Sequence, residues 1–336
     1  MTLFGDPNVW LPLTFAGLMG FAILVYVVLD GYDLGVGLLL AGASPAEKDR
    51  MIASIGPFWD ANETWLVLAV GLLLVAFPVA HGVILSTLYV PVAVMLLGLI
   101  LRGVAFEFRQ KVSAERKGAW NAAFFTGSLM TALAQGYMLG RYVMGLEPGV
   151  VAEAFAALTA ICVACGYAFI GSAWLIHKTE DELQLKAVRW ARRSLWFVAL
   201  GFVAISLASP LASPRIFAKW FALPEFILLA PLPLTAAAVF AATALILRRL
   251  PTTDDALNWA PFAGGVVLFA LAFTGLAYSF YPYVVPDRIT LFEAASAPES
   301  LAIILVGTLV IMPVILAYTA IAYVVFRGKA TDLRYD

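Results

Sequence analysis

Charged residues are scarce in this 336-residue chain, at 13% of the total, whereas hydrophobic residues make up 62%. A soluble domain carries about 25% charged residues, so this chain has too few to cover a water-facing surface. The net charge of −1 says nothing about nucleic acid, and no basic cluster is dense enough to suggest that the chain binds it. The composition predicts an integral membrane protein that forms one large helical bundle or two smaller ones.

Cysteine and histidine are equally scarce, with two of each. Cys162 and Cys165 lie inside an apolar run, and we interpret them as packing residues and not as a redox or metal pair. His81 falls in a short turn and His177 at the end of an apolar run. A membrane haem needs one or two axial ligands, commonly His or Met. The chain therefore has too few histidines for several haems, and a redox role would need a partner chain to carry them.

Long apolar runs without a ten-residue alternating pattern predict spanning helices and not a barrel. The fold class is therefore an all-α integral membrane protein. We predict nine spans, at residues 11–40, 61–77, 83–106, 120–141, 152–176, 195–212, 226–247, 260–281 and 301–326.

The segments between these spans differ in their content of Lys and Arg, which sets orientation. Successive segments lie on opposite sides of the membrane, so they form two sets. One set contains most of the basic residues, and the other contains only Arg141, Arg215, Lys219 and Arg288. The rule that cytoplasmic segments are positive then predicts an outside N-terminus and a cytoplasmic C-terminus.

Ionisable residues gather in three short segments at the predicted membrane boundary, residues 29–37, 59–65 and 102–109. The first predicted span ends on the cytoplasmic side, the second begins there, and the third ends there. The three segments are therefore expected to meet on that side. Ionisable groups near the bilayer interior are costly and by default mark a functional site.

Four acids in two of these segments are candidates for proton transfer. Asp30 and Asp33 are three residues apart, as are Asp60 and Glu63, so each pair shares a helix face. We expect the four to form the mouth of a proton path. Arg102 is the expected charge partner, which holds one carboxylate ionised while a neighbour exchanges its proton.

A structural interpretation of the same acids stays open. Asp30, Asp33 and Glu107 are either interfacial acids or buried partners of Arg102 that fix helix packing. Asp60 is the stronger functional candidate because no basic residue is near it in sequence.

Two further features are interpreted as packing. Gly31, Gly35 and Gly37 are expected to allow close helix contact, and Gln135 to form a hydrogen bond between helices. The sequence contains no phosphate loop, nucleophile–base arrangement or metal-ligand spacing.

The three segments also carry a family resemblance. They read Asp-Gly-Tyr-Asp-Leu-Gly-Val-Gly from Asp30, Trp-Asp-Ala-Asn-Glu-Thr-Trp-Leu from Trp59 and Arg-Gly-Val-Ala-Phe-Glu-Phe-Arg from Arg102. With Ala-Gln-Gly-Tyr at 134–137 and Tyr-Pro-x-x-x-Pro at 281–286, they resemble subunit II of cytochrome bd-type ubiquinol oxidases, most closely the cyanide-insensitive branch. Ala61 stands where the family usually has Gly.

The resemblance implies a fold of two four-helix bundles, residues 1–148 and 149–290, followed by a ninth helix and a cytoplasmic tail at 291–336. It implies a heterodimer in the bacterial cytoplasmic membrane with subunit I, which binds two b-type haems and haem d, oxidises quinol and reduces oxygen to water. Some relatives add a small single-helix subunit or hold a structural quinone in this subunit. In the family, the aspartate at the position of Asp60 is implicated in a proton path at the subunit interface.

Two other functions are compatible with the residues themselves. The chain could be a purely structural or assembly subunit of the same complex, or a stand-alone proton-coupled transporter. Transporters usually carry broken helices in corresponding halves, and the sequence shows none.

Overall fold

The computed structural model describes residues 5–252 and 255–330, nearly all of them helical. In chain order the elements are α1 (Pro7–Leu39), η1 (Leu40–Gly42), α2 (Pro45–Ile55), α3 (Trp59–Ala76), α4 (Pro78–Lys111), η2 (Ala114–Arg116), α5 (Lys117–Val143), α6 (Val150–Lys178), α7 (Asp181–Ala212), α8 (Pro214–Phe221), α9 (Glu225–Leu229), α10 (Pro231–Arg249), α11 (Ala260–Phe280), β1 (Tyr283–Val285), β2 (Ile289–Thr290), α12 (Leu291–Ala294) and α13 (Pro298–Val325).

Within the described residues, 8 helical segments are long and apolar enough to cross a membrane. They are α1, α3, α4, α6, α7, α9 with α10, α11 and α13. This result confirms an all-α membrane protein with many spans. The remaining predicted span, 120–141, corresponds to α5, a helix of 27 residues that contains Gln135 and Arg141 and is not among these eight.

The predicted bounds differ most from the structure at α7, which begins at Asp181 and not near residue 195. Its first turns carry charged residues and lie beyond the apolar stretch, which is why hydropathy alone missed them. The predicted span 226–247 is interrupted, because α9 ends at Leu229 and α10 begins at Pro231.

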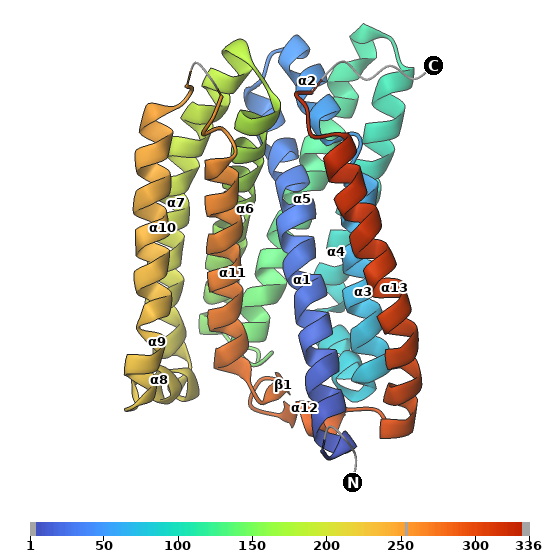
Figure 1. Cartoon of the computed structure of the whole chain (residues 1–336), viewed down its shortest axis with the longest axis vertical. Coiled ribbons are helices and arrows are strands. Elements are labelled where there is room, and N and C mark those ends of the chain that lie inside the picture. Colours follow the sequence, from blue (N-terminus) through green and yellow to red (C-terminus); the bar gives the residue numbers. More distant parts are fainter. Residues whose placement is uncertain (1–4, 253–254, 331–336) are drawn as a thin grey trace.

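The long helices lie side by side along the longest axis of the molecule (Figure 1). We call the end that carries α2 and the last turn of α13 the upper end, and the end that carries α8, β1, α12 and the start of α1 the lower end. Helix α1 is central, because it packs against α3, α5, α6, α11 and α13. Side chains on the second half of α1 are therefore enclosed by several other helices.

Several pairs of helices touch through glycine. A Cβ atom added at Gly35 of α1 would collide with the backbone carbonyl of Tyr167 in α6, and one at Gly171 would lie 2.5 Å from the carbonyl carbon of Gly35. Between α4 and α5, a Cβ at Gly127 would lie 2.6 Å from the carbonyl oxygen of Gly98. Small residues let membrane helices approach this closely. The predicted packing role of the glycines in the first motif is confirmed.

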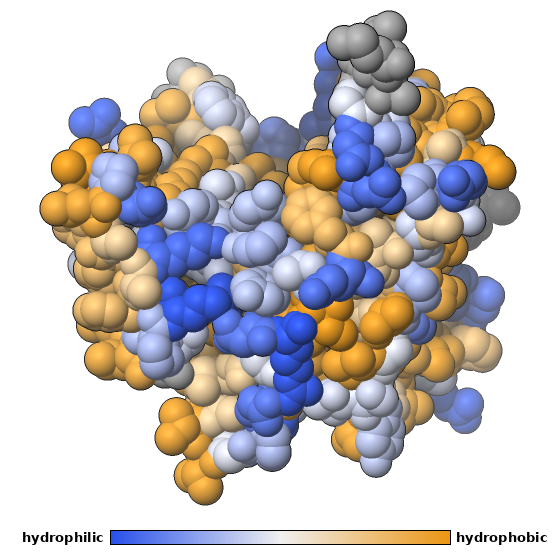
Figure 2. All heavy atoms as spheres, turned by 90° about the horizontal axis from the view of Figure 1, so that it is seen from below, coloured by the Kyte–Doolittle hydropathy of each residue, from blue (hydrophilic) through white to orange (hydrophobic). Residues whose placement is uncertain are grey.

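The lower end is held together by ion pairs and by β1, which pairs antiparallel with β2. Arg141 bonds Glu153 at 2.5 Å, and Arg215 and Arg288 each pair with an acid in a neighbouring segment. Figure 2 shows this end from below, with hydrophilic residues over its middle and hydrophobic residues around its sides. This distribution fits an end that meets water and sides that meet lipid.

We predict that Gly35→Ala destabilises the protein by about 1–3 kcal/mol, because the added methyl group overpacks the contact between α1 and α6. Gly17→Ala is the matched control, since a Cβ at Gly17 of the same helix meets no atom within 4 Å. Thermal unfolding of the purified protein in detergent measures both. Equal unfolding temperatures for the two variants would show that α1 and α6 are not in tight contact.

Candidate functional site: a buried cluster of acids around Arg102

The second half of α1 carries two carboxyl side chains into the interior. Asp30 and Asp33 both have an exposed fraction of 0%. They are buried because other helices surround α1 at this level, so side chains on every face of this turn are enclosed. A buried ionised carboxylate is stable only when it is paired and hydrogen-bonded. The neighbours of these two acids therefore decide what the site can do.

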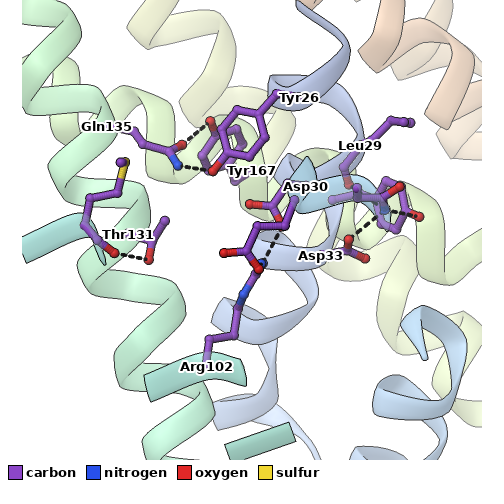
Figure 3. A network of polar contacts seen from close by, with 12 residues as sticks. Tyr26, Leu29, Asp30, Asp33, Arg102, Thr131, Gln135 and Tyr167 are labelled. Atoms are coloured by element: carbon purple, nitrogen blue, oxygen red, sulfur yellow. Dashed lines mark hydrogen bonds and ion pairs between the residues drawn. The ribbon is translucent and has the colours of Figure 1, made fainter. Parts of the chain in front are cut away.

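Arg102 of α4 is the central cation of the cluster, with an exposed fraction of 1%. Its Nη1 donates to Asp30 Oδ1 at 2.5 Å, and its Nη2 donates to Glu63 Oε2 at 3.3 Å. Figure 3 shows the guanidinium group pointing at Asp30. The side chain of Glu63 is 27% exposed. One arginine thus joins α1, α3 and α4 and links a buried acid to a partly exposed one.

Asp33 belongs to a second arm of the cluster. Asn62 of α3 donates from Nδ2 to Asp33 Oδ2 at 2.7 Å and to Tyr32 Oη at 2.8 Å. Tyr323 of α13 donates to Asn62 Oδ1 at 3.2 Å. Asp33 therefore has an amide partner and no direct ion pair among the described residues.

A third polar group lies next to Asp30, toward the lower end. Gln135 of α5 donates from Nε2 to Tyr26 Oη at 2.5 Å and accepts a bond of 2.6 Å from Tyr167 Oη. Figure 3 shows the two tyrosine rings beside the carboxyl group of Asp30. The prediction that Gln135 forms a hydrogen bond between helices is confirmed, since the bonds join α5 to α1 and α6.

Three polar atoms of the cluster have no hydrogen-bond partner within the described part of the chain. They are Asp30 Oδ2, Asp33 Oδ1 and Arg102 Nε, all buried. Buried polar atoms are almost always paired, with protein or with internal water. The cluster also contains three acids, Asp30, Asp33 and Glu63, for one arginine, so it has room for added protons. An ordered water could accept a hydrogen bond from Arg102 Nε or donate one to either carboxyl oxygen.

Two residues of the sequence prediction lie apart from the cluster. Glu107 does not pair with Arg102: it is half exposed and lies 3.8 Å from Lys111 Nζ. Of the two interpretations of Glu107, an interfacial acid or a partner of Arg102, the structure fits the first, because five helical residues turn Glu107 by roughly 140° from Arg102 around α4. Asp60 lies in the first turn of α3, is exposed, and makes no ion pair or side-chain hydrogen bond with the described residues.

The sequence analysis missed Asn62, Tyr26, Tyr167 and Tyr323. Asn62 lies inside the second motif, between Asp60 and Glu63, and its position alone could have marked it. The tyrosines carry no comparable signal, because most aromatic residues in apolar helices serve packing.

The third motif ends in a contact that fixes the surface helix α2 above the cluster. Buried Arg109 donates to Asp49 Oδ1 at 2.6 Å and to Asn121 Oδ1 at 2.5 Å, and Lys117 also bonds Asp49. Burial alone would raise the pKa of Asp49, but the bonds from Arg109 and Lys117 outweigh it and hold that pKa below its usual value. Asp49 therefore stays ionised at neutral pH and ties α2 to α4 and α5.

The two histidines lie at opposite ends of the molecule. His81 lies in the first turn of α4 at the lower end, and His177 lies in the last turn of α6 at the upper end. Their separation excludes that both ligate one haem iron. Among the described residues, no group of three or more His, Cys, Asp and Glu could hold a metal ion.

We predict that Arg102→Met destabilises the purified protein by about 3–5 kcal/mol, because it leaves buried Asp30 without a cation. Adding Asp30→Asn should recover part of this loss, since the amide carries no charge. Lys111→Met is the control: its ion pair is exposed and should change stability by less than about 0.5 kcal/mol. If the losses of stability measured for Arg102→Met and for Asp30→Asn alone simply add in the double variant, Arg102 and Asp30 are not energetically coupled.

Comparison with known proteins identifies the family. The family model for cytochrome bd terminal oxidase subunit II matches residues 11–326. Cytochrome bd-I ubiquinol oxidase subunit 2 of Escherichia coli is 26% identical over 369 residues, which cover 94% of this chain and 93% of that protein. Cytochrome bd ubiquinol oxidase subunit 2 of Bacillus subtilis is 26% identical over 330 residues, which cover 91% and 93%.

The fold agrees with this assignment. A chain in the structure of bd oxidase from Geobacillus thermodenitrificans matches with a TM-score of 0.75 and 17% identity, over 94% of this chain and 98% of that one. At that identity the match shows a shared fold. Because the family model spans nearly the whole sequence, this chain belongs to the cytochrome bd terminal oxidase subunit II family.

Proposed function

We propose that the cluster around Arg102 delivers protons from the cytoplasm for the reduction of oxygen to water. As a member of this family, the chain is subunit II of a terminal quinol oxidase, a multi-pass protein of the bacterial inner membrane that works with a partner subunit I. Reduction of oxygen to water consumes protons, so the complex needs a route for them. The acids of subunit II are placed to form part of that route.

The observation that carries this proposal is the graded burial of the acids. Asp60 is exposed at the start of α3, Glu63 one turn later is 27% exposed, and Asp30 behind it is fully buried. Residues three apart on a helix lie on the same face. The three carboxyl groups thus form a sequence from water into the helix bundle.

Arg102 gives this sequence its chemistry. When Asp60 passes a proton to Glu63, Glu63 becomes neutral and Arg102 keeps Asp30 as its ionised partner. When the proton moves on to Asp30, Glu63 is ionised again and takes over the pairing. The guanidinium group stays charged in both states, so no step leaves an unpaired charge buried. Asp33, without a direct cation, is the acid expected to hold a proton at rest.

The proposal depends on an orientation in which the upper end is cytoplasmic. The N-terminus is then outside, the C-terminus is inside, and α5 is a further span, which gives nine in all. Most of the Lys and Arg outside the spans lie in segments of the upper end, consistent with the rule that cytoplasmic segments are positive. Residues 1–148 and 149–290 then form the two four-helix bundles, and 291–336 the ninth helix and tail.

The redox centres belong to the partner in this proposal. Subunit I would bind two b-type haems and haem d and would oxidise quinol, which the names of the relatives give as ubiquinol. The positions of His81 and His177 support this division. A structural quinone in this chain and a small single-helix subunit are further expected components, and the apolar sides of the molecule would face lipid or the partner.

A purely structural role is the second candidate. The buried pair of Arg102 and Asp30 joins two helices, and such a pair can fix packing without moving protons. Under that role, loss of an acid lowers the assembly of the complex and its haem content together with its activity. Under the proton-path role, activity falls while the haems stay in place.

We predict that Asp60→Asn and Glu63→Gln, each purified with the partner subunit, retain the haems but reduce oxygen at least about tenfold more slowly, because a proton-transfer group has been removed. Glu107→Gln is the matched control, since Glu107 is an exposed acid at the same end that pairs with Lys111. Oxygen consumption and haem spectra are measured on the same samples. Normal oxygen consumption in both acid variants would overturn the proton path.

The orientation is tested separately by single cysteines in a variant that lacks Cys162 and Cys165. Glu299→Cys lies in the first turn of α13 at the lower end, and Glu115→Cys follows α4 at the upper end. A membrane-impermeant maleimide should label residue 299 from outside the cell, and residue 115 only in inverted vesicles. The opposite labelling pattern would reverse the topology and remove the cytoplasmic entry.

A further inference from the structure

Helix α13 is the most peripheral of the candidate spans, yet it contributes a side chain to the acid cluster. Its buried share is the smallest among the eight. Near its upper end, Tyr323 Oη lies 2.6 Å from Tyr32 Oη and donates to Asn62 Oδ1 at 3.2 Å. This hydroxyl group is the connection between the last helix and the arm that contains Asp33.

The directions of these hydrogen bonds form a closed ring. Asn62 donates from Nδ2 to Tyr32 Oη, and Tyr323 donates to Asn62 Oδ1. A hydroxyl group has a single hydrogen to donate, so the bond between the two tyrosines must run from Tyr32 to Tyr323. Each group in the ring donates once and accepts once. The second N–H of Asn62 is then left over, and it points at Asp33 Oδ2.

The ring sets the orientation of the Asn62 amide. An asparagine amide can turn over and exchange its oxygen for its nitrogen, and its partners decide which way it stands. Here the Tyr323 hydroxyl donates to the amide, so the amide oxygen of Asn62 must face α13. The amide nitrogen then faces Asp33. Without the Tyr323 hydroxyl, Asn62 Oδ1 and the Tyr32 hydroxyl each lose a partner. Only the acceptors around Nδ2, which are Asp33 Oδ2 and the Leu29 carbonyl oxygen at 3.4 Å, then favour this orientation of the amide.

The ring of Tyr323 is held in place by aromatic contacts. It stacks on Phe58, with centroids 4.6 Å apart and planes at 27°, and meets the edge of Trp174 at 6.1 Å. Trp174 also stacks on Tyr32 at 4.2 Å. Aromatic pairs at these separations favour a fixed arrangement of the rings.

The chain after α13 is fastened to the upper end by residues 326–330, which we call the C-terminal latch. The buried Lys178 of α6 donates from Nζ to the carbonyl oxygens of Phe326 and, at 2.9 Å, of Gly328. The backbone N–H of Ala330 donates to the carbonyl oxygen of Lys178 at 2.7 Å, and Lys329 pairs with Asp255 at 3.0 Å. The latch holds the last turn of α13, and with it Tyr323, against α6.

We infer that Tyr323 is a positioning residue for Asp33: it fixes the Asn62 amide so that Asp33 always meets a donor at Oδ2 and exchanges its proton at Oδ1. This inference rests on the proposed proton-transfer function. Of the two carboxyl oxygens of Asp33, Oδ1 is the buried one without a partner among the described residues, so it is the oxygen that can take a proton or a water. The outermost helix thereby controls the hydrogen-bond polarity at an acid on the central one.

The test uses Tyr323→Phe in the complete complex with its haem-bearing partner. Infrared difference spectra between two pH values report the C=O stretch of protonated carboxyl groups, and Asp33→Asn identifies the band of Asp33. Tyr323→Phe should shift that band and slow oxygen consumption about threefold to tenfold, because one hydrogen bond of the ring is lost. Tyr318→Phe, on the exposed side of α13, should do neither.

Tyr32→Phe opens the same ring at other bonds but leaves the bond from Tyr323 to Asn62 Oδ1 in place, so it should shift the band in the same direction by a smaller amount. It is the variant to measure if Tyr323→Phe does not assemble. An unchanged Asp33 band in both variants would overturn the inference. A shifted band with normal oxygen consumption would leave the positioning by Tyr323 intact and would contradict the proposed proton-transfer role of Asp33. If Asp33→Asn removes no band, Asp33 exchanges no proton and the inference fails together with that role.

Discussion

The structure depends on a charge that is difficult to bury: the guanidinium group of Arg102, 1% exposed among apolar helices. It is tolerated because Asp30 lies 2.5 Å away and Glu63 3.3 Å away. Those two partners come from α1 and α3, so the requirement to pair one charge fixes how three helices face each other. The close glycine contact between α1 and α6 then encloses the pair and separates it from lipid. Packing and chemistry share the same residues here.

The proposed function depends on the acid of the Arg102 ion pairs that is not fully buried. The side chain of Glu63 is paired with the buried arginine and is still 27% exposed, so in the proposed path it would connect water with the interior. In that proposal the same arginine would support either carboxylate, and protons would be exchanged without exposing the cluster. The lower end, where Arg215, Arg141 and Arg288 pair with surface acids, offers no comparable entry among the described residues.

Much of this arrangement could be predicted from the sequence, because costly charges in apolar helices leave few choices. The long apolar runs and the convergence of Asp30, Glu63 and Arg102 follow from hydropathy and topology. The sequence analysis left open whether Glu107 is an interfacial acid or a partner of Arg102, although its helical phase relative to Arg102 separates the two. The contact between Tyr323 and Asn62 joins residues 261 apart in sequence, and no sequence pattern in either segment predicts it. Contacts of that kind depend on how the last helix packs, which local patterns do not encode.

The central claim is that Asp30 conducts protons and does not only pair with Arg102. Its most direct test is the rate of proton uptake during a single reduction of oxygen, followed with a pH-sensitive dye in the assembled complex carrying Asp30→Asn. If the account is correct, electrons reach the haems at the normal rate while proton uptake is delayed. Proton uptake that keeps its normal rate while the haems are fully present would contradict the account and would leave the Arg102 cluster a structural one.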